Sequence, residues 1–315
     1  MSRNLSDLRI VFMGTPAFAV ASLEALLAAG ANVVGVITAP DRPAGRGLQL
    51  QPSEVKKAAI QHQLPLLQPE KLKDPGFQDQ LRAWQADVQV VVAFRMLPES
   101  VWNMPPLGSI NLHASLLPKY RGAAPINWAI IHGETETGVT TFRLQHEIDT
   151  GGVLMQEKID LSPDETAGVL HDRLMQLGAS LIVKTLQGIA EGSIQETPQA
   201  ITTDDSHLPK APKIHTNTCK IDWNQKTESI YNLIRGLSPY PGAFIDWNHT
   251  ALKIFSAKPD ISPHNLEPGS WRSDGKSNFS MAASDGWIHI EELQLAGKKR
   301  MDVASWLRGY RLPDQ

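Results

Sequence analysis

The sequence predicts an α/β fold, with a mostly parallel sheet in the first two thirds of the chain and a smaller barrel in the last third. Short runs of almost entirely apolar residues alternate with helix-like segments up to about residue 190. Strands that are apolar on both faces are typical of parallel sheets covered by helices on both sides. At 315 residues, 42% of them hydrophobic, the chain is long enough for two domains with their own cores.

Four buried strands are predicted early in the chain, because each is a continuous apolar run flanked by turn residues. They cover residues 8–13, 32–38, 87–94 and 108–113, and residues 137–144 have the pattern of a further strand. Helices are expected between and after these strands. The helical patterns cover residues 18–30, which end on Gly30, residues 53–63, which begin with Ser53 as a candidate N-cap, and residues 123–132 and 166–190.

The stretch 198–212 is rich in Pro, Thr, Asp and His and has no periodicity, which is typical of a linker. We therefore expect a first domain over residues 1–205 and a second over 206–315. The second contains a short helical pattern at 226–236 and several strand-like segments separated by Pro and Gly. Short strands between frequent turns favour a small barrel.

The charge is unevenly distributed along the chain. Residues 210–315 hold 14 Lys and Arg against 11 Asp and Glu, whereas the preceding 209 residues hold 16 against 22. If the protein binds a polyanion, the C-terminal part is the favoured half, although a solvated surface explains the same charges. A single cysteine, Cys219, excludes an internal disulfide framework and a multi-thiolate metal site. No apolar run reaches the roughly 18 residues of a membrane span and no signal-peptide pattern is present, so we expect a soluble, cytoplasmic protein.

Two short motifs are weak when taken alone. Residues 14–16, Gly-Thr-Pro, follow the first strand, but neither G-x-G-x-x-G nor a P-loop is present, so a plain tight turn is favoured over NAD or ATP binding. Asp149-Thr150-Gly151 occurs once, whereas aspartic proteases need two carboxylates that share a proton. An Asx turn before the glycines is the structural alternative.

Asn111 and His113 close the fourth strand and, being two residues apart, lie on the same face of it. Ligands of open α/β sheets bind beyond the carboxyl ends of the strands, and Asp149 follows the next strand pattern. A lone histidine at a strand end is more often structural, but three such groups together favour chemistry. Because no nucleophile accompanies them, the set suits transfer to an external nucleophile, with two donors for an oxyanion and a carboxylate that orients the imidazole or takes a proton.

The segment SINLHASLLPKYRGAAPI at 109–126, with HEIDTGG at 146–152, resembles the folate-dependent formyltransferases. The resemblance continues through RIVFMGTPAFA, APDRPAGRG, the IDW of 221–223 and AGKKRM at 296–301. Within the family, it is greatest to the members that formylate initiator methionyl-tRNA. It implies a Rossmann-like formyltransferase sheet with an OB-like C-terminal barrel that binds tRNA. It also implies 10-formyltetrahydrofolate as formyl donor, no metal, and a monomer.

The resemblance assigns roles to matching positions. It implies that Asn111, His113 and Asp149 are catalytic. It places the following residues along the 10-formyltetrahydrofolate site: Ser115, Leu116, Leu117 and Pro118. The composition of residues 39–52 favours a plain surface loop when taken alone. The resemblance implies instead that this insertion meets the acceptor end of the tRNA. The tRNA contacts implied are Arg42, Arg46, Lys298, Lys299 and Arg300, of which the last three would otherwise be a solvated turn.

Two departures from the family pattern are present. Leu48 and Gln49 follow Gly47, where many relatives have lysines, and Phe94-Arg95-Met96 stands where a Tyr-Gly pair is common. Two alternatives also stay open. One is a formyltransferase whose acceptor is a small amine, either an amino sugar nucleotide or a glycinamide ribonucleotide. The other is a catalytically inactive, RNA-binding relative.

Overall fold

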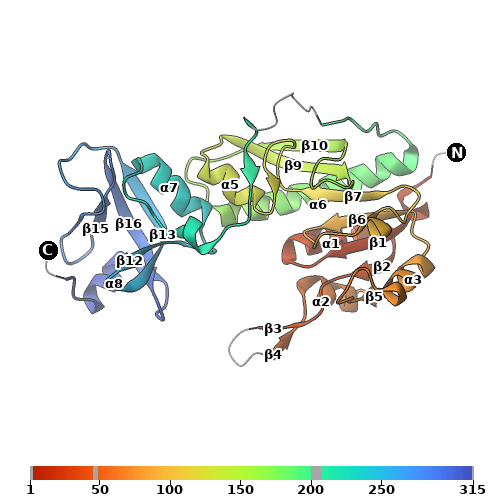
Figure 1. Ribbon diagram of the computed structural model, residues 1–315, viewed down its shortest axis with the longest axis horizontal. Helices are drawn as coiled ribbons and strands as arrows, with labels where there is room; N and C mark the ends of the chain where they lie inside the picture. Colours follow the sequence, from red (N-terminus) through yellow and green to blue (C-terminus); the bar gives the residue numbers. More distant parts are fainter. Residues whose placement is uncertain (1–2, 45–48, 200–206, 314–315) are drawn as a thin grey trace. The chain divides into compact units, whose positions relative to one another are not determined.

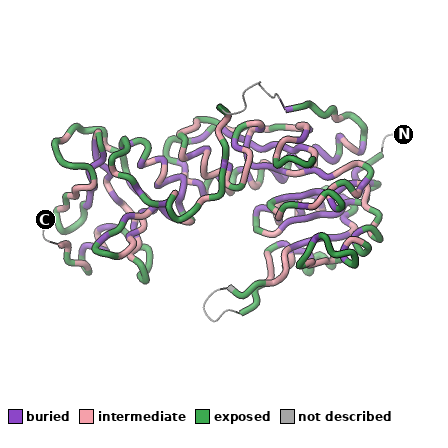
Figure 2. Tube along the Cα trace, viewed as in Figure 1, coloured by how far each residue is buried: buried purple, intermediate pink, exposed green. Residues whose placement is uncertain are grey.

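The computed structural model describes residues 3–44, 49–199 and 207–313 and divides the chain into two compact units (Figure 1). Unit 1 comprises Met1–Gly122, Thr137–Ile159 and His171–Lys210. Unit 2 comprises Ala123–Glu136, Asp160–Leu170 and Ala211–Gln315. Figure 2 shows that buried residues run along the strands of both units and that exposed residues lie mainly in the connecting segments.

Unit 1 is built on a seven-stranded sheet with the order β10-β9-β7-β6-β1-β2-β5. Its strands are β1 (Arg9–Gly14), β2 (Asn32–Ile37), β5 (Leu66–Leu67), β6 (Val88–Val92), β7 (Ser109–His113), β9 (Glu136–Arg143) and β10 (Val153–Asp160). The five strands from β5 to β7 are parallel, whereas β9 runs antiparallel to β7. The predicted mostly parallel sheet is therefore confirmed, and its reversal at β9 is a feature that the strand pattern did not indicate.

Helices α1 (Ala17–Ala28), α2 (Glu54–Gln61), α3 (Pro75–Ala83), α4 (Glu99–Trp102) and α6 (Ala167–Glu191) accompany this sheet, and a 3-10 turn, η1 (Leu5–Asp7), precedes it. The central strands are buried because they are apolar on both faces: Ile10, Val11, Phe12 and Met13 are completely buried. Ser53 caps α2 as predicted, since its Oγ accepts a hydrogen bond from Lys56 N at 3.0 Å.

The insertion 39–52 contains a small hairpin of β3 (Arg42–Ala44) and β4 (Gln49–Gln51), which pair antiparallel. Asp41 anchors the start of this hairpin. One of its carboxylate oxygens accepts a hydrogen bond from Lys56 Nζ at 2.6 Å, and the other accepts one from Gln68 Nε2 at 2.8 Å. The hydrogen bond from Lys56 lowers the pKa of Asp41 below its ordinary value of 3.8. The base of the insertion is thus tied to α2 and to the segment after β5.

Unit 2 contains an antiparallel sheet with the order β12-β13-β16-β15-β14, and β17 pairs with β16. The strands are β12 (Ala243–Trp247), β13 (Thr250–Asp260), β14 (Trp271–Ser273), β15 (Phe279–Ala282), β16 (Trp287–Leu295) and β17 (Met301–Asp302). The helices of this unit are α5 (Pro125–Ile131), η3 (Thr216–Cys219), α7 (Thr227–Gly236) and α8 (Val303–Gly309). This sheet confirms the small barrel-like domain that the short strands predicted.

An aromatic cluster fills the core of unit 2. Phe279 is only 1% exposed, and its ring centroid lies 5.3 Å from that of Trp247 and 5.2 Å from that of Trp306, both in edge-to-face geometry. Cys219 belongs to the same core, and burial raises the pKa of its thiol. Among the described residues, no helix combines the length and apolar character needed to cross a membrane.

Part of the predicted linker is packed rather than extended. Thr197 and Val153 exchange two backbone hydrogen bonds, of 2.7 and 2.8 Å, and Gln199 is 5% exposed. Further along, Pro209 O accepts from Tyr120 N at 2.6 Å. Within the predicted linker, Gln199 and Pro209 therefore contact unit 1, in contrast to the expectation from composition. Residues 200–206 lie outside the described part of the chain.

Candidate active site

Strand β7 presents Asn111 and His113 on one face of the sheet of unit 1. Their neighbours in sequence, Ile110 and Leu112, point to the opposite face and are 0% and 4% exposed. The two apolar side chains anchor the strand in the core, so the two polar side chains that alternate with them are held rigidly. Asn111 is half-buried, and within the described residues its side-chain amide has no hydrogen-bond partner. Its donors are therefore available to a ligand.

The structure brings His113 and Asp149 together. His113 Nδ1 lies 3.8 Å from Asp149 Oδ2, and the two side chains are only 8% and 14% exposed. On the other side of the ring, Nε2 lies 2.9 Å from Tyr120 O. Because a carbonyl oxygen can only accept, Nε2 carries a proton, and Nδ1 is the nitrogen that faces Asp149.

Asp149 sits on a constrained turn. Its φ of 55° lies in the left-handed region, and its Oδ2 accepts a hydrogen bond from Gly122 N at 2.9 Å. Gly151 cannot carry a side chain, since a Cβ there would lie 1.7 Å from Arg143 O. The glycine after the Asp-Thr pair is thus required by close backbone packing.

Asp149 reaches His113 by a route that the sequence did not predict. Because β9 is antiparallel to β7, Leu144 follows β9 beside the amino end of β7, where its N–H donates to Ser109 O at 2.8 Å. The chain must turn back over residues 144–149 to bring the carboxylate to His113 at the opposite end of β7. Asp149 therefore lies near His113 as expected. It does so through a turn after an antiparallel strand, and not from the carboxyl end of a parallel strand.

The segment that follows β7, Ser115 to Pro118, is tied down by its own polar contacts. Thr140 Oγ1 donates to Ser115 O at 2.7 Å and lies 3.2 Å from Leu117 N, and Leu117 and Pro118 are joined by a cis peptide bond. The side chains of Ser115 and Leu117 are buried, whereas Leu116 and Pro118 are half-buried. Of the four residues expected along the folate site, these last two are the better placed to touch a ligand through their side chains.

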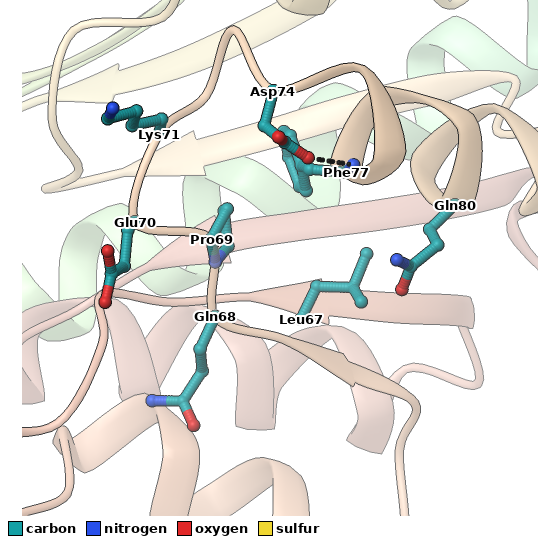
Figure 3. A pocket seen from close by; sticks show the side chains of 8 residues that line it. All are labelled: Leu67, Gln68, Pro69, Glu70, Lys71, Asp74, Phe77 and Gln80. Atoms are coloured by element: carbon teal, nitrogen blue, oxygen red, sulfur yellow. Dashed lines mark hydrogen bonds between the residues drawn. The ribbon is translucent and has the colours of Figure 1, made fainter.

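A pocket of about 340 Å³ lies beside the Asp149 turn. It is lined by Pro118, Arg121, Gly122, Glu147, Ile148, Thr150, Leu208, Pro209 and Lys210. A larger hollow of about 420 Å³ lies between β5 and α3 and is lined by none of the predicted site residues (Figure 3). In that hollow the Asp74 carboxylate caps α3 by accepting from Phe77 N at 2.9 Å.

The departure at Phe94-Arg95-Met96 has a structural role. Arg95 Nη1 donates to Glu70 O at 2.8 Å, and Nη2 donates to Pro69 O. Partial burial lowers the pKa of the guanidinium, as does the neighbouring Arg42. Arg95 thus ties the loop after β6 to the segment after β5, while Met96 is 73% exposed.

The predicted tRNA contacts fall on both units. Arg42 is exposed at the start of β3 in unit 1, and Arg46 lies outside the described residues. In unit 2, Lys298 and Lys299 are exposed in the turn between β16 and β17. Arg300 is engaged within the unit, since it bonds to Glu292 and its guanidinium carbon lies 4.6 Å from the centroid of the Phe255 ring.

Sequence reasoning missed three groups that complete the site: the Tyr120 carbonyl, the Gly122 N–H and the side chain of Gln199. The first two are backbone groups, which no residue pattern identifies. Gln199 stands in a stretch without periodicity and without a motif. In the described part of the chain, no group of three or more His, Cys, Asp or Glu side chains is arranged to hold a metal ion. The site therefore offers an amide donor, an imidazole and a carboxylate beside a pocket.

Comparison with protein families gives two matches that together span most of the chain. Residues 8–186 match the model described as "Formyl transferase", and residues 213–311 match that described as "Formyl transferase, C-terminal domain". The segment between them includes Gln199.

Curated relatives match over almost their whole length. A protein of Bacteroides fragilis named "Methionyl-tRNA formyltransferase" is 53% identical over 313 residues, which cover 98% of this chain and 97% of the relative. Proteins of the same name from Parabacteroides distasonis and Flavobacterium johnsoniae are 54% and 50% identical, over 97% and 99% of this chain.

Solved structures with low sequence identity share the fold. HypX from Aquifex aeolicus, in complex with tetrahydrofolic acid, is 17% identical with a TM-score of 0.65; the match covers 96% of this chain and 47% of HypX. An N-formyltransferase from Helicobacter canadensis, in complex with folinic acid and dTDP-3-aminofucose, is 19% identical with a TM-score of 0.68 and is covered completely.

Proposed function

The chain belongs to the formyl transferase family, and from this membership we propose that it transfers a formyl group from 10-formyltetrahydrofolate to the amino group of initiator methionyl-tRNA. One observation carries the choice of acceptor: relatives named for this activity are about half identical to the chain from end to end. The complexes of HypX and of the H. canadensis enzyme with folates support the choice of donor.

The proposed reaction is direct transfer. The amine nitrogen of the methionyl ester bonds to the formyl carbon, the bond from that carbon to N10 of the folate breaks, and N10 takes up a proton as the amine loses one. The Asn111 amide and the His113 imidazole stabilise the oxyanion that develops on the formyl oxygen. Each such donor is worth about 10²–10³ in rate in other enzymes.

The contacts of His113 define how it would act. Since Nε2–H is committed to Tyr120 O, the ring donates to an oxyanion through Nδ1, which requires the imidazolium form. The Asp149 carboxylate faces this nitrogen, with Oδ2 at 3.8 Å from Nδ1. The separation is longer than a hydrogen bond, which leaves room for the carboxylate to accept the amine proton directly or through a water molecule.

Folate and tRNA contacts complete the proposal. We assign Ser115, Leu116, Leu117 and Pro118 to the folate site, the buried two through their backbone. Arg42 and Arg46 are assigned to the acceptor end of the tRNA. For Lys298, Lys299 and Arg300 the proposed role is contact with tRNA phosphates. We further propose domains at 1–205 and 206–315, a monomeric protein and a cytoplasmic location.

A direct test is incubation of the purified protein with methionyl-tRNA and 10-formyltetrahydrofolate. After mild base hydrolysis of the ester, N-formylmethionine should be detected by mass spectrometry. The same assay with an amino sugar nucleotide or glycinamide ribonucleotide as acceptor is the comparison. Formylation of a small amine but not of methionyl-tRNA would move the function to the alternative acceptor class. No product with any acceptor, from folded protein at several salt concentrations, would indicate an inactive relative.

A further inference from the structure

Gln199 occupies an unusual position for a residue in a stretch without periodicity. It is 5% exposed, and its side chain makes four hydrogen bonds. Its Nε2 donates to Asp149 O and to Gly151 O, each at 2.8 Å. Its Oε1 accepts from Arg121 Nε at 3.1 Å and from Arg121 Nη2 at 2.6 Å. These partners allow a primary amide to be buried here, because each polar group left unpaired would cost free energy.

These contacts join two segments that carry parts of the acid–base pair. The turn 149–151 carries the Asp149 carboxylate. The segment 120–122 carries the carbonyl that orients His113 and the N–H of Gly122 that holds Asp149 Oδ2. Gln199 bonds to the first segment through its NH₂ group and to the second through Arg121. One side chain therefore closes a ring of contacts around the His113–Asp149 pair.

We propose that Gln199 is a positioning residue, which fixes the Asp149 carboxylate opposite His113 by holding the backbone of its turn against the segment of Arg121 and Gly122. This inference rests on the proposed formyl transfer for its catalytic consequence. It assigns a functional task to a residue that lies between the two family matches, in the stretch whose composition indicates a linker.

The backbone of Asp149 explains why such support is needed. A non-glycine residue with a φ of 55° is strained unless its surroundings over-determine it. The hydrogen bond from Gly122 N restrains only the carboxylate, whereas Gln199 restrains the carbonyl of the same residue. Without Gln199 the turn can relax, and a displacement of about 1 Å at a reacting group can cost about 10²-fold in rate.

Two substitutions of similar size distinguish the hydrogen bonds that the NH₂ group of Gln199 donates from those that its Oε1 accepts. Gln199→Met removes every hydrogen bond. Gln199→Glu keeps an acceptor for Arg121 but places a second oxygen against the carbonyls of Asp149 and Gly151. In both, kcat for formylation of methionyl-tRNA should fall about 10- to 100-fold, while KM for the tRNA and for the folate should stay within about two-fold.

Gln78→Met is the matched control. Gln78 Nε2 also ties two segments of unit 1 together, donating to Leu72 O at 3.0 Å and to Ser100 Oγ at 2.8 Å. Its loss should lower the melting temperature, though less than Gln199→Met because fewer bonds are lost, and should leave kcat unchanged. If the control lowers kcat equally, or if Gln199→Glu keeps full activity, the proposal is wrong. It is also wrong if both Gln199 variants fail to fold, since the residue then serves stability alone.

A readout without substrate keeps this test independent of the proposed function. Hydrogen exchange at the Gly122 amide, which bonds to Asp149 Oδ2, should become at least about ten-fold faster in both Gln199 variants and stay unchanged in Gln78→Met. If the wild-type protein formylates no methionyl-tRNA but Gly122 responds in this way, the proposed function fails and the positioning contact stands. Unchanged exchange at Gly122 would overturn the positioning role itself.

Discussion

Two sets of polar contacts, one in each unit, join residues at very different distances along the chain. In unit 2, Asp274 accepts from the backbone N–H groups of Lys276, Ser277 and Asn278, and Asp302 accepts from Ser305 N, so the partners lie within four residues. In the candidate site of unit 1, the bonded pairs Gly122–Asp149, Asp149–Gln199 and Arg121–Gln199 are 27, 50 and 78 residues apart.

This difference indicates a division of tasks. In unit 2, Asp274 closes a turn and Asp302 caps a helix. Longer contacts, such as that of Asp285 with Thr227 at a separation of 58 residues, and the aromatic core hold this unit together. In unit 1, the long-range contacts fix a few polar groups beside the carboxyl end of β7, where the proposed reaction would depend on their mutual geometry. Substitutions in the two units should therefore affect different observables.

The largest expected effect is on the chemistry of unit 1. His113→Ala should lower kcat about 10²–10⁴-fold, because it removes both an oxyanion donor and the partner of Asp149. The dissociation constant of the folate, measured by calorimetry, should change by less than about three-fold. His62→Ala is the control, since His62 pairs with Glu24 at 2.8 Å away from the predicted site residues and should leave kcat intact. A large loss of folate affinity at unchanged kcat would contradict the role given to His113.

The next effect concerns the stability of unit 2. Phe279→Ala should cost about 3–5 kcal/mol in the free energy of unfolding, because a 1%-exposed aromatic ring leaves a cavity among Trp247 and Trp306. Urea denaturation followed by tryptophan fluorescence measures it. Leu266→Ala, at a position that is 50% exposed, should stay within about 0.5 kcal/mol. Equal effects of the two would mean that this aromatic cluster does not hold the unit together.

Acid should weaken unit 2 before unit 1. In unit 2, hydrogen bonds from the backbone of Asn278, Ser277 and Lys276 hold the pKa of Asp274 well below its ordinary value of 3.8, and those from Ser305 lower the pKa of Asp302. Because the folded-state pKa is lowered, this stabilisation is complete above about pH 5 and is lost as the pH falls through 3.8 and below.

Hydrogen exchange between pH 6 and pH 3, corrected for intrinsic rates, should show protection lost first in unit 2. Asp274→Asn removes the titrating charge but keeps an accepting oxygen. In this variant, the protection of unit 2 should therefore depend less on pH in the acid range. If both units lose protection at the same pH, and Asp274→Asn does not change that pH, then the two units do not differ in acid sensitivity as expected.

The smallest expected effect is on the tRNA contacts proposed for unit 2. The double variant Lys298→Gln, Lys299→Gln should raise KM for methionyl-tRNA and reduce the slope of log affinity against log salt by about one per lost phosphate contact, with kcat unchanged. Lys184→Gln, on α6 of unit 1, should leave the slope as it is. An unchanged slope in the double variant would restrict the proposed RNA contacts to other residues.

The sequence predicted most of the fold because its signals are local. Apolar runs located β1, β2, β6 and β7 within one or two residues, Ser53 marked the start of α2, and helical periodicity identified α6. The reversal at β9 was not predictable, because a buried strand has the same composition in either direction. The short β5 and α4 were missed, since two to four residues carry little periodicity. The longer α3 and β10 were also missed, although Asp74 marks the start of α3 as an N-cap.

The candidate site was predictable only in part. Alternation along a strand placed Asn111 and His113 on one face, and the approach of Asp149 was expected without its route. Gln199 could not be predicted, because its partners are two backbone carbonyls and an arginine, at least 48 residues away along the chain. Contacts to backbone groups leave no complementary residue type to recognise, and this holds for Tyr120 and Gly122 as well.

The burial of Cys219 has a practical consequence for biophysical work. The chain has one cysteine, and that thiol is 4% exposed with a raised pKa, so little of the reactive thiolate is present near neutral pH. The native protein should therefore react little with thiol-specific labelling reagents. A maleimide dye or spin label would react almost exclusively with a cysteine introduced at an exposed position of either unit.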